Sequence, residues 1–109
     1  MEYVLTKFKI KKGSLDRFNE LLKMTHEDRH AFEEGLKECG VSMECQFVES
    51  SPDGDFFYVF KRVESNENLK KTIKSSPAPI HDVVRLIHTE CLEGRQDLKS
   101  IITADPHTR

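Results

Sequence analysis

Residues 26–30 match the pattern HExxH, with His26 and His30 at its ends. In zinc hydrolases this pattern places two imidazole ligands one helical turn apart and a glutamate as the general base. A helix that carries it is apolar and buried, whereas the variable positions here hold Asp28 and Arg29, and no third ligand is evident. We therefore interpret both histidines as residues of a solvated helix face and expect no metal. Zinc-dependent hydrolysis is the least favoured alternative.

A second candidate for chemistry is His88, which follows His81 by seven residues, or two turns of a helix. His88 borders the apolar stripe of that helix, so it could point into a cleft between the helix and a sheet. Because imidazole titrates near neutral pH, a half-buried histidine suits proton transfer. A structural histidine bonded to a backbone carbonyl fits the same pattern, so both interpretations stay open.

Five polar side chains in the predicted strands form the third candidate site. We expect them on the sheet face that helices leave uncovered, provided that the strand register is right. Aromatic walls with a few charged groups are typical of small-molecule sites, but the same residues could pair within a subunit interface. Glu44 and Tyr58, together with His88, are the candidate acids or bases. The five predicted ligand-binding residues are Lys7, Glu44, Gln46, Tyr58 and Arg62.

The elements that must position these residues follow the order strand, helix, strand, strand, helix, strand. Apolar alternation predicts strands over 3–10, 41–50, 55–63 and 98–104. Apolar residues at spacings of three and four predict helices over 14–39, 65–74 and 80–93. This order, βαββαβ, predicts an α+β, ferredoxin-like fold with a four-stranded antiparallel sheet and helices on one face.

Alternation in the second predicted strand assigns Val41 and Phe47 to one face and Glu44 and Gln46 to the other. The uncovered face of the sheet would then expose an apolar patch on the order of several hundred Å², which monomers seldom do. We therefore predict that the open faces of two chains pack together as a homodimer. Helices that wrap further around the sheet are the alternative. The predicted patch contains Leu5, Val48 and either Phe56, Tyr58 and Phe60 or Phe57 and Val59.

Length and composition limit the class of protein. A chain of 109 residues suits one domain, which we predict over 1–104 with a tail at 105–109. The 17 Lys and Arg against 19 Asp and Glu give a net charge of -2, which argues against a nucleic-acid partner. No apolar run approaches the roughly 20 residues of a membrane span. The acidic start and three cysteines without CxxC spacing favour a cytoplasmic protein with free thiols.

The chain resembles ferredoxin-like proteins that pair as dimeric α/β barrels, and among them a group of small uncharacterised bacterial proteins. The similarity lies in residues 4–13, 41–44, 57–59 and 80–91. That superfamily includes cofactor-free monooxygenases, isomerases, haem-dependent enzymes and stress-response proteins, so the resemblance implies a fold and no single activity. The chain lacks Trp, and no haem-ligand pattern matches, so we expect no cofactor. The leading hypothesis is a homodimer that binds a small apolar or aromatic molecule; the alternative is a protein whose open face serves assembly only.

Overall fold

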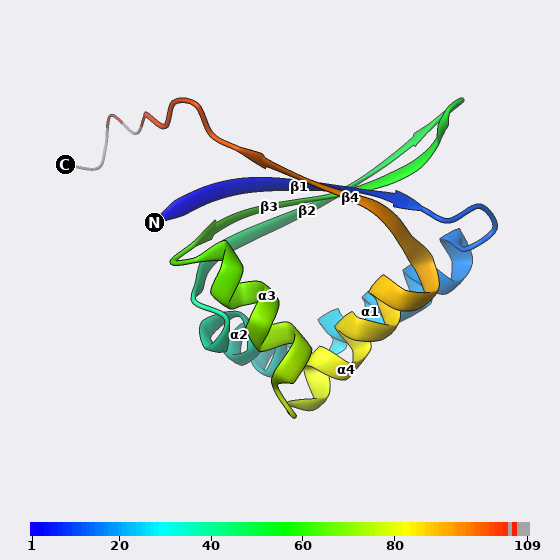
Figure 1. Cartoon of the computed structure of the whole chain (residues 1–109). Coiled ribbons are helices and arrows are strands. Elements are labelled where there is room, and N and C mark those ends of the chain that lie inside the picture. The colour runs from blue at the N-terminus through cyan, green and yellow to red at the C-terminus, as the bar shows by residue number, and fades with distance from the viewer. Residues whose placement is uncertain (105, 107–109) are drawn as a thin grey trace.

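Four antiparallel strands form one sheet in the order β2-β3-β1-β4, and the helices lie together on one of its faces (Figure 1). The strands are β1 (Glu2–Ile10), β2 (Val41–Ser51), β3 (Gly54–Val63) and β4 (Leu92–Lys99). The helices are α1 (Leu15–Glu27), α2 (Arg29–Glu38), α3 (Asn66–Ser75) and α4 (Pro79–Leu86), and a π-helical turn follows at Ile87–Cys91. The predicted α+β, ferredoxin-like fold is confirmed.

The structure, a computed structural model, describes residues 1–104 and 106. The predicted tail at 105–109 therefore lies outside the described residues, apart from Pro106. Within the described chain, no helix is long and apolar enough to cross a membrane.

The single helix predicted over 14–39 is wrong, because the chain leaves the helical conformation at Asp28. Its φ of -105° and ψ of 89° separate α1 from α2. The Asp28 carboxylate accepts a hydrogen bond from the backbone N–H of Ala31 (3.0 Å) and so caps the start of α2. Aspartate is favoured at this capping position because its carboxylate can accept hydrogen bonds from nearby backbone N–H groups in place of a backbone carbonyl.

The fourth strand also differs from the prediction. The chain turns from helix to strand at Leu92, so the helix predicted over 80–93 ends two residues early, and the strand predicted over 98–104 is misplaced. A bulge lies opposite Phe8, where Gly94 takes a positive φ of 63°. β4 is a polar edge strand, so it lacks the apolar alternation by which strands are predicted.

A second bulge decides which way the β2 side chains point. Val41 pairs with Val63 and Met43 with Arg62, so Ser42 is the extra residue. The bulge shifts the alternation by one position. The predicted faces of β2 after Val41 are therefore wrong. Glu44 and Gln46 face the helices, and Met43, Cys45 and Phe47 lie on the open face.

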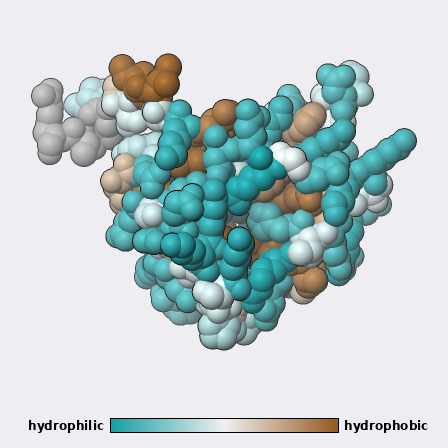
Figure 2. Space-filling model, viewed as in Figure 1, coloured by the Kyte–Doolittle hydropathy of each residue, from teal (hydrophilic) through white to brown (hydrophobic). Residues whose placement is uncertain are grey.

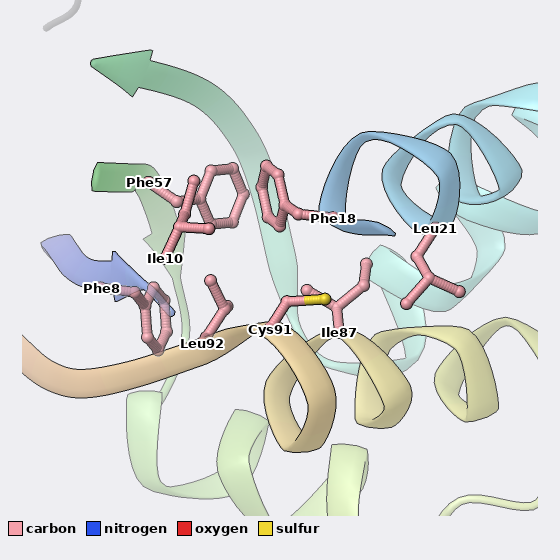
Figure 3. Close-up of a cluster of buried hydrophobic side chains, with 8 residues drawn as sticks. All are labelled: Phe8, Ile10, Phe18, Leu21, Phe57, Ile87, Cys91 and Leu92. Atoms are coloured by element: carbon pink, nitrogen blue, oxygen red, sulfur yellow. The ribbon is translucent and has the colours of Figure 1, made fainter. Parts of the chain in front are cut away.

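Side chains between the sheet and the helices form two core clusters. In the first, Phe18 of α1 packs edge-on against Phe57 of β3, with ring centroids 4.9 Å apart (Figure 3). Edge-to-face aromatic pairs of this kind add stability beyond the apolar area that they bury. The first cluster contains Phe8, Ile10, Phe18, Leu21, Phe57, Ile87, Cys91 and Leu92. The second contains Val4, Cys39, Val41, Val63 and Leu69.

Candidate functional site

A cavity of about 110 Å³ lies between the helices and the covered face of the sheet. Members of both core clusters contribute to its wall, which is largely apolar. On the surface in Figure 2, brown apolar residues are visible in recesses between teal polar ones. A dry cavity of about 150 Å³ can hold benzene, and this cavity is somewhat smaller, so it has room for part of a small organic molecule. The polar residues of its wall are Thr6, Thr25, Glu44, Gln46, Lys61, His81, His88 and Arg95.

Lys61 is the most deeply buried charged side chain of the cavity wall, with 3% of its surface exposed. Its Nζ donates a hydrogen bond to Thr6 Oγ1 (2.8 Å), and the Thr6 hydroxyl donates to Asp97 Oδ1 (2.8 Å). Burial, assisted by the positive charge of Arg95, lowers the pKa of Lys61 to about 8. Slightly above neutral pH, Lys61 is therefore an uncharged amine in a sizeable fraction of the molecules.

Asp97 is the carboxylate that balances the cations at this end of the cavity. It forms ion pairs with Lys70 (3.0 Å) and Arg95 (3.2 Å) and accepts a weaker hydrogen bond from Asn66 Nδ2 (3.3 Å). Burial alone would raise the pKa of Asp97, but the hydrogen bonds from Lys70 and Thr6, together with Arg95, lower it to about 2. One carboxylate thus stands among three cations, Lys61, Lys70 and Arg95.

Glu44 lies opposite Lys61 in the β2–β3 pairing and also lines the cavity. Burial raises the pKa of Glu44, against the opposing effects of a hydrogen bond from Gln46 and the charge of Lys61. Gln46 Nε2 donates to Glu44 Oε2 (2.8 Å), and Gln46 Oε1 lies 3.1 Å from Nε2 of the exposed His26. A chain of polar contacts therefore leads from the surface to the half-buried carboxyl group.

His88 reaches the cavity from the π-helical turn, a local widening of the helix that often occurs at functional sites. Its ring packs edge-on against Phe8, with centroids 5.0 Å apart. Burial, with the charges of Arg95 and Lys61, lowers the pKa of His88 to about 4. The imidazole is therefore neutral at pH 7 and can accept or donate a hydrogen bond there.

His81 also lines the cavity, but its ring is already engaged. Its Nε2 lies 2.8 Å from Glu38 Oε1, and the Ser76 hydroxyl donates to the same carboxylate (2.8 Å to Oε2). These contacts tie α4 and the end of α3 to α2. We assign His81 to structure.

The comparisons with known proteins agree with this fold. The profile of one protein family, described as a family of unknown function, matches residues 1–108. The chain belongs to the DUF6176 family. No curated protein matches this DUF6176 chain.

Solved structures share the fold of this DUF6176 protein at low sequence identity. An antibiotic biosynthesis monooxygenase aligns with a TM-score of 0.61 and 16% identity over 95% of this chain and 100% of its own. A Pseudomonas aeruginosa protein aligns with a TM-score of 0.61 and 9% identity, over 94% of each chain. A dimeric protein of unknown function and ferredoxin-like fold from Bacteroides fragilis aligns with a TM-score of 0.58 and 14% identity, over 91% and 93%. At these identities the likeness concerns the fold.

The five residues predicted to share the open face lie on both faces of the sheet. Glu44 and Gln46 line the covered cavity with His88, whereas Lys7, Tyr58 and Arg62 lie on the open face. There the Lys7 ammonium is 4.5 Å from the Phe56 ring centroid. Tyr58 Oη donates to Glu49 Oε1 (2.8 Å), and Arg62 Nε donates to Ser42 Oγ (2.8 Å). These contacts suit a sheet surface, and the candidate site consists of the cavity residues.

The HExxH residues do not share one helix. His26 belongs to α1 and His30 to α2, with the break at Asp28 between them. His26 contacts Gln46 and packs edge-on against Phe32 (5.5 Å between centroids). Among residues 1–104 and 106, no three His, Cys, Asp or Glu side chains lie close enough together to hold a metal ion.

Four site residues escaped the sequence-based reasoning: Thr6, Lys61, Arg95 and Asp97. Two of them carried a usable signal. Thr6 is a polar position on the otherwise apolar face of β1 that holds Val4 and Phe8, and Lys61 directly follows the apolar run Phe56–Phe60. A polar residue in an apolar pattern is the informative observation, because burying it requires a partner.

Proposed function

We propose that this DUF6176 protein binds a small, largely apolar molecule in the cavity between the sheet and the helices. One observation carries the proposal. Several ionisable side chains line the apolar cavity, and three of them, Glu44, Lys61 and His88, form no ion pair with one another within the described chain. A mostly apolar pocket with a few convergent polar groups is the usual form of a small-molecule site.

A purely structural role explains these groups less well. Burial of a charged side chain with incomplete pairing costs stability, and apolar residues of similar volume would fill the same space at no such cost. Groups that reduce stability in this way are typical of sites kept for function. The alternative in which the chain serves assembly only leaves the lysine and the carboxyl group without a role.

The residues of the cavity wall also indicate which chemical groups the ligand carries. With Lys61 and Arg95 against Asp97, the polar end of the cavity favours a ligand oxygen that accepts hydrogen bonds. The apolar remainder, with the Phe57 ring and Val59, suits an aromatic or branched aliphatic body. Benzyl alcohol, benzoate and benzylamine share such a body and differ in the polar group, so they make a matched set of probes.

The test is an NMR titration of the protein with each of these three probes. We expect saturable shifts of cavity residues with benzyl alcohol and benzoate, and weaker binding of benzylamine, because the cations repel it. Val59→Phe should fill the cavity and abolish the shifts. Val48→Phe is the matched control, since Val48 of β2 lies on the same face of the sheet as Val59 but is 48% exposed and does not line the cavity. Absence of saturable shifts with all three probes would contradict the proposal.

We further propose that two chains pair through the open face of the sheet. That face leaves Met43, Phe47 and Leu98 between 41% and 55% exposed, beside the half-buried Phe56 and Phe60. An apolar surface of this kind is typical of a subunit interface. The Bacteroides fragilis protein of the same fold, described as dimeric, supports this arrangement.

Light scattering coupled to size-exclusion chromatography tests the dimer. Phe47→Glu should yield monomers, because it places a charge in the proposed interface. The neighbouring Val48 points to the other face and is similarly exposed, so Val48→Glu should stay dimeric. A monomeric parent chain, or equal dissociation in both variants, would refute the proposed interface.

The free thiols of Cys39, Cys45 and Cys91 support a cytoplasmic location.

A further inference from the structure

We infer that Lys61 is a nucleophile that captures a small aldehyde or ketone as an imine, an inference that rests on the proposed ligand cavity. The position of the side chain is the first argument. Lys61 lies in the wall of an apolar cavity, and within the described chain the one hydrogen bond of its side chain is to Thr6. A lysine desolvated in an apolar pocket beside other cations is the usual form of an imine-forming lysine.

The charges around Lys61 favour the neutral amine that such a reaction requires. With its pKa lowered to about 8, Lys61 is neutral in about one tenth of the molecules at pH 7. This is roughly three hundred times the neutral fraction of an ordinary lysine. The Thr6 hydroxyl accepts a hydrogen bond from Nζ and donates one to Asp97, so it fixes the position of Nζ and links it to that carboxylate. The charged or titratable groups that act on Lys61 are Glu44 from β2, Arg95 and Asp97 from β4, Lys70 from α3 and His88 from the π-helical turn.

The reaction needs no oxidant or reductant. The lone pair of Nζ forms a C–N bond to the carbonyl carbon, and the carbonyl oxygen becomes a hydroxyl as it takes up a proton. Loss of that hydroxyl as water, with loss of the remaining N–H proton, leaves a C=N double bond. The products are one imine and one water, and hydrolysis returns the amine and the carbonyl compound.

Glu44 is placed to supply the proton for the loss of water. It lies across from Lys61 on the same sheet face and lines the same cavity, and burial raises its pKa, as is usual for a carboxyl group that serves as a general acid. Gln46 holds its Oε2 and connects it to His26 at the surface, where protons exchange with water. Glu44 therefore acts as a general acid in this scheme.

Reductive trapping with benzaldehyde and sodium cyanoborohydride tests the inference. Hydride reduces the C=N bond to a stable benzyl amine, and peptide mass spectrometry identifies the labelled residue. At pH 7 we expect labelling of Lys61 about tenfold faster than that of the exposed Lys23 of α1. Benzyl alcohol should compete at Lys61 and leave Lys23 unaffected. Glu44→Gln should slow labelling of Lys61 with the lysine still present.

Two variants separate the possible outcomes. Val59→Phe should reduce labelling of Lys61 about tenfold by filling the cavity, whereas Val48→Phe should not. Labelling that avoids Lys61 while benzyl alcohol still binds saturably would overturn the imine and leave the proposed cavity function intact. Loss of both labelling and benzyl alcohol binding would overturn both. Lys61→Arg, which keeps the charge, provides a folded reference that cannot form the imine.

Discussion

Glu44 and Lys61 occupy opposite positions in the neighbouring strands β2 and β3, and both side chains face the covered cavity. They form no ion pair with each other in the described part of the chain; Lys61 bonds to Thr6, and Glu44 accepts from Gln46. Each group is thus held by a neutral partner, with the carboxyl pKa raised and the amine pKa lowered by burial. A pair of this kind is suited to exchange protons with a ligand.

The first prediction concerns the stability cost of Lys61. Its pKa falls from 10.5 to about 8 on folding, so the unfolded chain binds more protons between these values and stability rises with pH across that window. Below pH 8 the full cost applies, on the order of 3 kcal/mol. Lys61→Met should therefore be more stable than the parent by about 1–3 kcal/mol at pH 7, and this advantage should shrink toward pH 10. Urea unfolding at both pH values measures the difference.

Lys23→Met serves as the control, because Lys23 is exposed on α1, away from both faces of the sheet. Its stability relative to the parent should change little between pH 7 and pH 10. If Lys61→Met is less stable than the parent at pH 7, the lysine stabilises the fold and the argument for a functional role is lost.

The second prediction concerns acid. His88 has a pKa near 4 in the folded protein against 6.5 for an ordinary histidine, so it stabilises the fold above pH 6.5 and loses this contribution as the pH falls toward 4. The loss should reach about 3 kcal/mol, since one pKa unit corresponds to about 1.4 kcal/mol. His88→Phe should flatten the stability curve between pH 6.5 and 4. His30→Gln, at an exposed position, should leave the curve unchanged.

Direct titration of the His88 ring by NMR provides an independent measurement. Its Cε1 proton should keep the chemical shift of the neutral ring down to about pH 5. A titration midpoint above pH 6 would show that the ring is hydrated in solution, and the cavity would then be more open than the packing of His88 on Phe8 indicates.

The order of elements could be predicted from the sequence because it depends on strong apolar periodicity. The hairpin between β2 and β3 is an example: Gly54, with a φ of 131°, follows Pro52 and Asp53 as the turn chemistry requires. β4 could not be predicted, since an edge strand exposed to water carries polar side chains at most positions.

The candidate site was predicted only in part, because a single bulge residue reverses the faces of a strand. Alternation counted from Val41 places Glu44 and Gln46 on the open face, and the extra residue Ser42 moves both to the cavity. Ser42 has no sequence signature that distinguishes it from an ordinary strand residue. The long-range contact of Lys61 with Thr6 likewise follows from the β1–β3 pairing, which local sequence does not encode.

The third prediction concerns the close approach of α2 to α4. A Cβ atom added at Gly35 would lie 2.9 Å from Ile80 Cγ2 and 3.5 Å from His81 Cε1. Overpacking costs about 1–3 kcal/mol, and the better helix propensity of alanine returns up to about 1 kcal/mol. Gly35→Ala should therefore destabilise the fold by about 1 kcal/mol in urea unfolding. In the Ile80→Leu background, which lacks Cγ2, the same substitution should be neutral or stabilising; an equal cost in both backgrounds would exclude this contact as the cause.

The fourth prediction joins Asp97 to the reactivity of Lys61. The negative charge of Asp97 raises the pKa of Lys61 against the effects of burial and Arg95. Asp97→Asn removes that charge, so the Lys61 amine should be neutral at lower pH. The pH at which benzaldehyde labelling of Lys61 reaches half its maximum should therefore fall below the parent value of about 8. The fold should also lose about 2 kcal/mol at neutral pH, because the pKa of Asp97 drops from 3.8 to about 2 on folding.

Glu67→Gln is the matched control for this change. Glu67 also contacts Lys70 (3.5 Å), but its side chain is 76% exposed, and no charge effect of Glu67 on Lys61 is resolved. Its labelling profile should overlay that of the parent. Because the midpoint of the profile is measured on folded protein, it separates an electrostatic effect from a loss of stability. A midpoint that rises in Asp97→Asn would mean that Asp97 does not stabilise the charged form of Lys61. The account of the charges around Lys61 would then be wrong.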